Sequence, residues 1–198
     1  MPIDKVKYQK IIELITKNIS DFELIILALL NSKNREPIRN DLFFQKEIFL
    51  ILNFIKEMFP SADFIAHTFG PYSEVAEKSL NNLNSYKLVE KKDEGYGLSD
   101  LGTEIFKKLE SRLSKEKLEV IEDFKNFLND LTRDELLVFT YISFPEFTDE
   151  SGIKDKIYSI RKPVSLSLFK KGKISIEKAA FLSGIPLEEF IKYIEKCQ

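Results

Sequence analysis

FIAHTFGPYSEVAEKSLNNLNSYKLVEKKDEGYGLSDLGTEIF, residues 64–106, is the stretch of this sequence that decides the fold. It contains a Gly70-Pro71 turn and then Ser73, which is a good N-cap for a helix. Apolar residues recur at helical spacing after Ser73, and two short β-prone runs and a second capped helix follow. This order predicts one complete winged helix-turn-helix with its wing attached.

The expected helix after Ser73 has an apolar face and a polar face. Val75, Ala76, Leu80 and Leu83 fall on one side, which we expect to face the core. The other side carries hydrogen-bonding groups of the kind that meet base edges and phosphates in the major groove. We therefore predict contacts with double-stranded DNA from this helix and from lysines on or near the wing: Ser73, Lys78, Asn81, Asn82, Ser85, Lys87, Lys91 and Lys92.

The expected wing is a β-hairpin. Its first strand begins at Leu88, Lys91–Gly97 supplies a charged turn with two glycines, and the second strand returns at Tyr96. Ser99 then caps the next helix.

The polar face also has a second interpretation. Glu74 and Glu77 would oppose a phosphate, and a solvated surface would have the same composition. Winged helices also serve as protein-docking modules. We favour DNA binding, as a transcriptional regulator, and the alternative is an antitoxin-like or adaptor protein that binds a partner protein.

Apolar segments precede this region. Asp21–Asn31 is expected to form a buried helix, with Tyr8–Ile19 as its amphipathic lead-in. Asn31–Asn40 is expected to be a loop, and Asp41–Phe59 a second long helix that ends at Pro60.

The pattern from Ser99 through Asp130 is nearly all helical. Apolar residues spaced by threes and fours form a seam of the coiled-coil type. This seam either packs within the chain, which we favour, or forms a homodimer contact. Its residues are Val120, Phe124, Phe127 and Leu131.

The C-terminal segment contains a second helix-turn-helix signal, IEKAAFLSGIPLEEFIKYI, residues 176–194. Ala179 and Ala180 allow two helices to approach closely, Gly184 permits a left-handed turn, and Phe190 helps to close a small core. Before it, Thr132 caps a helix through Ile142 and a loop follows.

We predict a mainly α fold: a winged helix-turn-helix with a short β-hairpin wing, a helical extension and a small C-terminal helix-turn-helix. The expected segments are a winged-helix domain with a long connecting helix (1–131), a helix and linker (132–152) and the C-terminal module (153–198).

Basic residues gather before and within the C-terminal signal. From Arg161 to Lys178 there are six basic residues and one acid, Glu177. A solvated surface accounts for this patch as well as phosphate contact does. If the module binds DNA, we expect the backbone contacts to come from Lys170, Lys171 and Lys173.

Two aromatic residues, Phe144 and Phe147, lie in the loop FPEFTDESG. We favour a local hydrophobic plug between the domains. The alternative is a docking site for a partner protein.

Composition excludes several classes of protein. The net charge of -2 means that affinity for nucleic acid must come from a local patch. One cysteine gives neither a disulfide framework nor a cysteine-rich zinc site, which fits the cytoplasm. The longest apolar run, Leu24–Leu30, is too short for a membrane helix, and we see no signal peptide. His67 lacks a catalytic partner and no known catalytic motif appears, so we expect no enzyme, cofactor or metal.

The first half of the chain resembles the SocA-like or Panacea domain of prokaryotic antitoxins and adaptor-like proteins. The resemblance is carried by FGPYS (69–73), the spaced Leu80 and Leu83, LV (88–89) and GYGLSDLG (95–102). It implies a helical and winged fold.

LFKKGKISIEKAAFLSGIPLEEFIKYI, residues 168–194, is similar to a family of small prokaryotic antitoxin-like proteins. Pro163 departs from the family pattern, because it would restrict the start of the preceding helix. Both resemblances imply DNA-binding regulation, or neutralisation of a partner such as a toxin, without enzymatic chemistry. The matching positions are Gly172, Lys173, Ile174, Ser175, Ala179, Ala180, Gly184 and Phe190.

Overall fold

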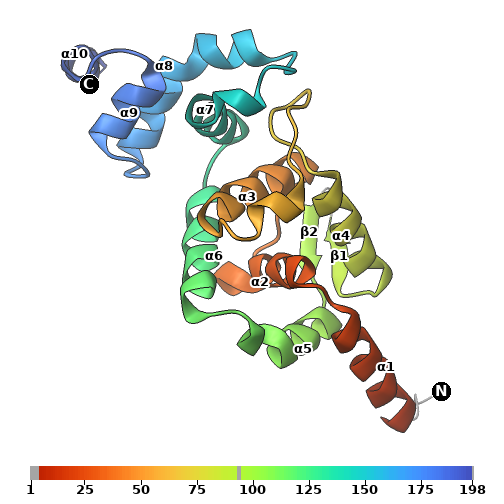
Figure 1. Cartoon of the computed structure of the whole chain (residues 1–198). Coiled ribbons are helices and arrows are strands. Elements are labelled where there is room, and N and C mark those ends of the chain that lie inside the picture. The colour runs from red at the N-terminus through yellow and green to blue at the C-terminus, as the bar shows by residue number, and fades with distance from the viewer. Residues whose placement is uncertain (1–4, 93–94, 198) are drawn as a thin grey trace. The chain divides into compact units, whose positions relative to one another are not determined.

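The computed structural model describes residues 5–92 and 95–197 (Figure 1). Within these residues the chain is mainly helical, with ten α-helices and one two-stranded antiparallel hairpin. The mainly α expectation is therefore confirmed.

The described residues divide into two compact units. Those within 1–63 and 73–126 form unit 1, and those within 64–72 and 127–198 form unit 2. These bounds differ from the segments 1–131, 132–152 and 153–198, which stay a prediction about domains. Residues 64–72 belong to unit 2, so the stretch 64–106 is divided between the two units.

Long-range contacts hold residues 64–72 within unit 2. The Ser151 hydroxyl donates to the Thr68 carbonyl at 2.9 Å, and the Arg133 guanidinium lies 6.0 Å from the centre of the Phe69 ring. The predicted turn is present, since Gly70 has φ 85° and its N–H donates to the His67 carbonyl. The His67 ring stacks on Tyr72 at 4.8 Å.

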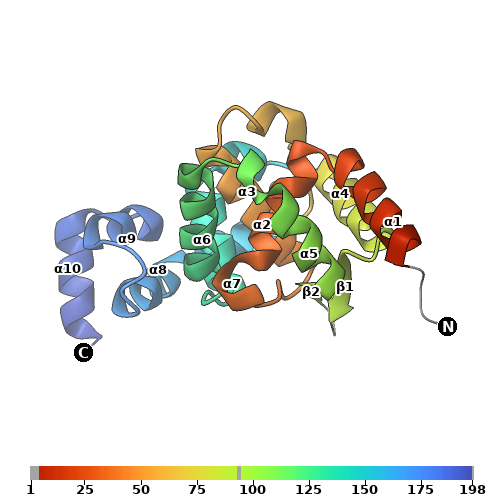
Figure 2. The same cartoon turned by 90° about the horizontal axis from the view of Figure 1, so that it is seen from below.

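Unit 1 is built on two apolar helices. The helix α2 is buried from Phe22 to Leu30, and Ser20 and Glu23 form a capping box at its start. It packs against α4, α5 and β2 (Figures 1 and 2). The elements that begin in unit 1 are α1 (Lys5–Asn18), α2 (Asp21–Arg35), α3 (Asp41–Phe54), η1 (Phe59–Ala62), α4 (Glu74–Ser85), β1 (Val89–Lys92), β2 (Gly95–Leu98), α5 (Asp100–Leu109), η2 (Glu110–Arg112) and α6 (Lys115–Leu128).

One predicted helix of unit 1 was too long. α3 ends at Phe54 rather than Phe59: the Asn53 side chain donates to the Phe49 carbonyl in its last turn, and Pro60 lies in η1. The segment from Ser99 to Asp130 is nearly all helical, as predicted, and Leu113, which is extended and 7% exposed, lies between η2 and α6.

The predicted seam packs within the chain, but the buried face of α6 is different. Phe124 lies 4.7 Å from Phe54, and Phe127 lies 5.3 Å from Phe139, measured between ring centres. The α6 residues that are fully buried are Ile121, Lys125 and Leu128. Burial at position 125 was not predicted from the sequence, because the residue is a lysine.

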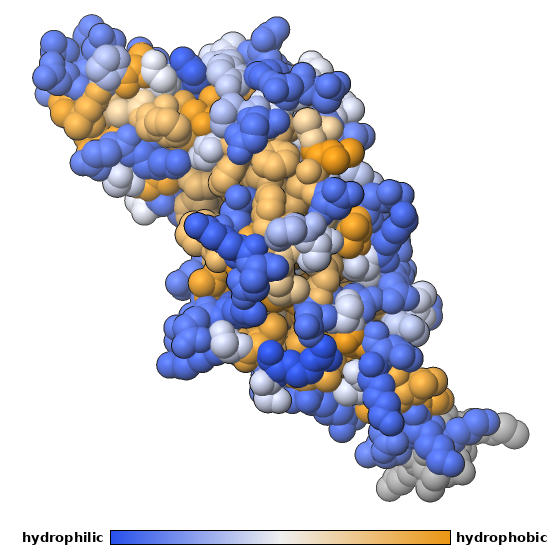
Figure 3. Space-filling model, in the orientation of Figure 1, coloured by the Kyte–Doolittle hydropathy of each residue, from blue (hydrophilic) through white to orange (hydrophobic). Residues whose placement is uncertain are grey.

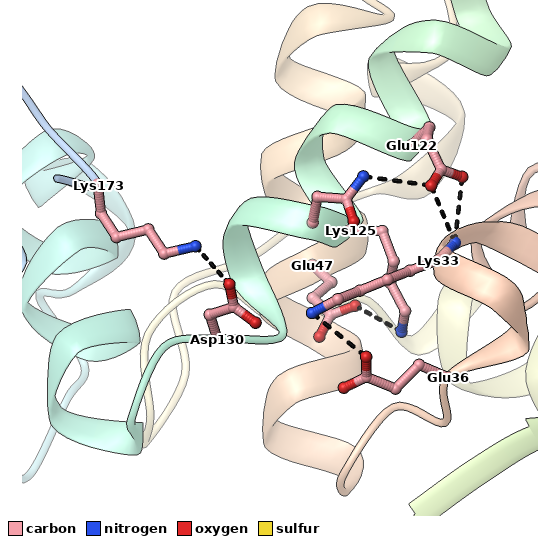
Figure 4. Close-up of polar contacts among 8 residues, drawn as sticks. Lys33, Glu36, Glu47, Glu122, Lys125, Asp130 and Lys173 are labelled. Carbon is pink, nitrogen blue, oxygen red and sulfur yellow. Dashed lines mark hydrogen bonds and ion pairs between the residues drawn. The ribbon is translucent and has the colours of Figure 1, made fainter. Parts of the chain in front are cut away.

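Lys125 forms a buried ion pair with Glu47 of α3 (Figure 4). Both side chains are fully buried, Lys125 Nζ lies 3.5 Å from Glu47 Oε2, and Glu47 Oε1 has no hydrogen-bond partner among the described residues. Burial raises the pKa of Glu47 more than the Lys125 ammonium lowers it. Burial also lowers the pKa of Lys125. The pair therefore joins two helices at a large desolvation cost.

Unit 2 is helical in its described part. A small core joins its last three helices through Leu166, Ala179, Ala180 and Phe190. Gly184 has φ 73° between the last two, as its predicted turn requires. The elements are α7 (Arg133–Ser143), η3 (Pro145–Phe147), α8 (Lys154–Lys170), α9 (Ile176–Ser183) and α10 (Leu187–Lys196).

Pro163 does not limit α8 as predicted. The helix begins at Lys154 and continues through Pro163 to Lys170. Ser159 and Pro163 are both exposed, so the carbonyl that loses its helical donor lies near solvent.

Candidate nucleic-acid interface

Ser73 fixes the start of α4 in the core of unit 1. Its hydroxyl accepts from the Ala76 N–H at 2.9 Å and donates to the Ala62 carbonyl. Its backbone N–H donates to Gln45 Oε1 at 2.8 Å, and its carbonyl accepts from Gln45 Nε2. The predicted N-cap is confirmed. Ser73 is fully buried, however, so its prediction as a DNA contact was wrong.

The two faces of α4 are those expected from the sequence. Ala76, Leu80 and Leu83 are buried, and Val75 is half-buried. α4 also contacts β1 of the hairpin. The exposed polar residues are Glu74, Glu77, Lys78, Asn81, Asn82, Asn84 and Ser85.

Some of these polar groups already have partners in unit 1. Lys78 Nζ lies 2.8 Å from Glu74, so its charge is partly compensated. The Asn82 side chain donates to Glu23 at 2.5 Å, and the Ser85 hydroxyl donates to the Asn82 carbonyl. Asn82 therefore secures α4 to α2 and is a poor candidate for base contact.

Within α4, Asn81 and Asn84 are the exposed amides that make no side-chain hydrogen bond to another described residue. An amide of this kind can donate to and accept from an adenine edge. Sequence analysis missed Asn84, although its spacing of three from Asn81 places the two on one helical face.

The hairpin has longer strands and a shorter turn than predicted. β1 pairs with β2 from Val89 opposite Leu98 to Lys92 opposite Gly95, so the connection falls on residues 93–94, outside the described residues. Gly95 is required there because a Cβ would lie 2.1 Å from the Ile38 carbonyl oxygen.

A third chain segment extends the hairpin at its second strand. Ile38, between α2 and α3, exchanges two backbone hydrogen bonds of 2.8 and 2.9 Å with Tyr96 of β2. The Tyr96 hydroxyl donates to Asp41. Burial, together with this hydrogen bond to a carboxylate, raises the pKa of Tyr96. These contacts join the hairpin to the start of α3.

The predicted lysines near the hairpin have different environments. Lys87 and Lys91 are exposed and make no ion pair among the described residues. Lys87 has φ 61°, and its carbonyl accepts from the Ser99 hydroxyl. The side chain of Lys92 lies outside what the structure describes. Lys87 and Lys91 thus remain available for phosphate contact.

The predicted C-terminal lysines are engaged within unit 2. Lys171 Nζ lies 2.8 Å from the buried Glu135, and Lys173 Nζ lies 2.5 Å from Asp130 (Figure 4). Lys170 Nζ donates to the Cys197 carbonyl at 3.0 Å. Two of the six basic residues between Arg161 and Lys178, Lys171 and Lys173, are therefore paired with carboxylates, which lowers the positive charge of this stretch.

Phe144 and Phe147 are half-buried rather than exposed, and Phe147 ends η3. The large apolar side chains that are exposed in the last two helices are Phe181, Leu187 and Ile191. Leu187 and Ile191 are spaced by four residues and share one face of α10. Where Figure 1 draws α10, Figure 3 shows a mainly hydrophilic surface with hydrophobic residues along its edge.

No family model, curated protein or solved structure matches this chain. The similarities to Panacea and antitoxin-like proteins therefore stay predictions. Among the described helices, none combines the length and apolar character needed to cross a membrane. In residues 5–92 and 95–197, no three or more His, Cys, Asp or Glu side chains are grouped to hold a metal ion.

Proposed function

We propose that unit 1 binds double-stranded DNA as a winged helix, with α4 in the major groove and the β1–β2 hairpin against the neighbouring backbone. The observation that carries the proposal is the division of α4. Its apolar face and N-cap are buried, whereas Asn81 and Asn84 are exposed on the other side. A rigid helix with unoccupied amides is suited to base readout.

The order of elements supports this proposal. The three helices α2, α3 and α4 precede the hairpin, and Ile38, which lies between α2 and α3, pairs with the second strand. The connection between α3 and α4, residues 55–73, is much longer than a helix-turn-helix turn. The proposal therefore rests on α4 and the hairpin rather than on a tight turn between helices.

The charges predict weak electrostatic attraction. Lys78 is paired with Glu74, and Glu77 and Glu90 are also exposed on this part of the unit. If Lys78, Lys87 and Lys91 each contact one phosphate, the logarithm of affinity falls with a slope of roughly -2 to -3 against the logarithm of salt concentration. Specificity must then come from the amides.

The test is binding to the gene's own upstream DNA and to a scrambled duplex, measured by fluorescence anisotropy at two salt concentrations. Asn81→Ala and Asn84→Ala should each weaken binding to the native sequence by about 1–3 kcal/mol and change binding to the scrambled duplex little. Lys91→Gln should weaken both and reduce the salt slope by about 1.

The matched control is Asn18→Ala, which removes an exposed asparagine at the end of α1. It should leave both affinities unchanged. Equal losses on both duplexes from the α4 variants would contradict base readout. Absence of saturable binding to either duplex would overturn the proposed function.

A second candidate is binding of a partner protein, as an antitoxin or adaptor would do. The exposed Leu187 and Ile191 on one face of α10 favour it, since a row of apolar residues is costly to leave in water. Leu187→Ser with Ile191→Ser should abolish co-purification of a genetically adjacent protein but leave DNA binding intact. Retention of that protein would contradict a role for α10.

A further inference from the structure

A groove between α8 and α10 gathers three lysines around one tyrosine. It has a volume of about 310 Å³ and is lined by Lys162, Glu189, Lys192, Tyr193 and Lys196. Lys192 and Lys196 are exposed, whereas Lys162 and Tyr193 are half-buried. We call this the α8–α10 groove.

The helices that form this groove are held together beneath it. Phe190 of α10 is fully buried against Leu166 of α8 and Ala179 and Ala180 of α9. The Lys162 ammonium lies 4.3 Å from the centre of the Tyr193 ring, which joins α8 directly to α10. The lysines therefore project from a packed scaffold rather than from a loop.

The lysines of the groove differ from other lysines of unit 2, whose charges are paired with carboxylates. Lys171 and Lys173 pair with Glu135 and Asp130. Lys192 and Lys196 make no ion pair among the residues described by the structure, and Glu189 is the one carboxylate of the lining. Three ammonium groups against one carboxylate form a site for an anion.

We propose that the α8–α10 groove binds a small phosphorylated molecule with at least two negative charges. Ammonium groups donate strong charge-assisted hydrogen bonds to phosphate oxygens, and Lys162, Lys192 and Lys196 surround one space. Its volume lies at the lower end of the range for small-molecule sites and suits a ligand of about the size of a mononucleotide. The Tyr193 ring borders the same space.

This site is independent of the proposed DNA interface. It uses neither α4 nor the hairpin, and its lysines differ from Lys170, Lys171 and Lys173, which were predicted to contact the DNA backbone. Loss of one binding activity would therefore leave the other unchanged.

The test is isothermal titration calorimetry of the full chain with inorganic pyrophosphate, followed by titration with ATP. We expect saturable binding that weakens with added salt. Lys192→Gln and Lys196→Gln should each weaken it by about tenfold, the effect of one lost charge-assisted hydrogen bond. Glu189→Gln should strengthen it several-fold, because it removes the one repelling carboxylate.

The matched control is Lys156→Gln, which removes an exposed lysine of α8 that does not line the groove. It should bind pyrophosphate like the unaltered chain. Because Lys192, Lys196 and Glu189 are all exposed, unchanged circular dichroism and melting temperature will separate lost binding from lost folding.

Three outcomes would overturn the proposal. One is no binding of pyrophosphate or ATP at about 5 mM ligand. Another is the same weakening from Lys156→Gln as from Lys192→Gln. The third is a Lys192- and Lys196-dependent affinity for duplex DNA without binding of pyrophosphate, which would assign these lysines to a nucleic-acid backbone.

Discussion

At the scale of single residues, the buried ion pair between Glu47 of α3 and Lys125 of α6 affects the stability of the fold. Lys125→Met leaves Glu47 buried without its cation, and we expect a loss of about 3–5 kcal/mol at neutral pH. Burial raises the folded-state pKa of Glu47, because the uncharged acid is easier to bury than the carboxylate. The stability of the variant should therefore decline as pH rises from 4.5 toward that pKa. The loss should therefore be smaller at acidic pH.

Glu47→Leu is the matched variant, and its stability should change with pH in the opposite direction. It leaves Lys125 buried, and the pKa of this lysine is lowered, so the stability of that variant should increase as pH rises toward 10.5. The double variant should recover most of the lost stability. Urea unfolding monitored by circular dichroism at several pH values measures all three. Parallel pH profiles for the two single variants would contradict this account.

Local chemistry explains which residues could be assigned from the sequence. Four helix ends were predicted because each is fixed by a local interaction. Three begin with a side chain that accepts from a backbone N–H three residues further on, and one ends with a left-handed glycine: Ser73, Ser99, Thr132 and Gly184. The buried position of Lys125 depends on a partner 78 residues away. No local pattern contains that information.

At the scale of elements, Glu135 joins the start of α7 to the end of α8. Its carboxylate accepts from the Thr132 N–H, the Ser167 hydroxyl and the Lys171 ammonium, each at 2.8 Å. Burial raises the pKa of Glu135, but these donors together lower it below its ordinary value. The carboxylate thus stabilises unit 2 in its charged form.

Glu135→Gln should destabilise unit 2 by about 1–3 kcal/mol at pH 7, because Lys171 is partly exposed and its contribution is screened. Because the folded-state pKa of Glu135 is lowered, its carboxylate stabilises the unit above pH 4.5, and this stabilisation is lost as pH falls through that pKa. The difference in stability between the unaltered chain and Glu135→Gln should therefore shrink in acid. Thermal unfolding at pH 7 and pH 3 tests this. The control, Glu146→Gln, removes an exposed carboxylate and should have no effect.

Elements were predictable where periodicity and caps agree, as in α4, and less so where tertiary packing sets their ends. α3 stops at Phe54, where the Asn53 side chain bonds the Phe49 carbonyl, and the extended, buried Leu113 lies between η2 and α6. The polar face of α4 was anticipated. The hydrogen bond from Asn82 to Glu23 was not anticipated, because Glu23 belongs to another helix, α2.

At the scale of the whole molecule, the sequence suggested one continuous winged module, whereas residues 64–72 belong to unit 2. The contact between Ser151 and Thr68 that places them there spans 83 residues. Likewise, the pairing of Lys171 and Lys173 with acids from other segments lowers the positive charge of the basic patch in the linear sequence. Charge and domain membership both depend on distant partners.

Two units with separate cores should respond separately to a cavity. Phe190 is fully buried, so Phe190→Ala should cost unit 2 about 3–5 kcal/mol. Hydrogen exchange followed by mass spectrometry should show lost protection in α8, α9 and α10, with α2 and α3 of unit 1 unchanged. Phe181→Ala, at a side chain that is 57% exposed in the same unit, should change little. Equal loss of protection in α2 would mean that the two cores unfold as one cooperative body, and effects on DNA binding and pyrophosphate binding could then no longer be assigned to separate units.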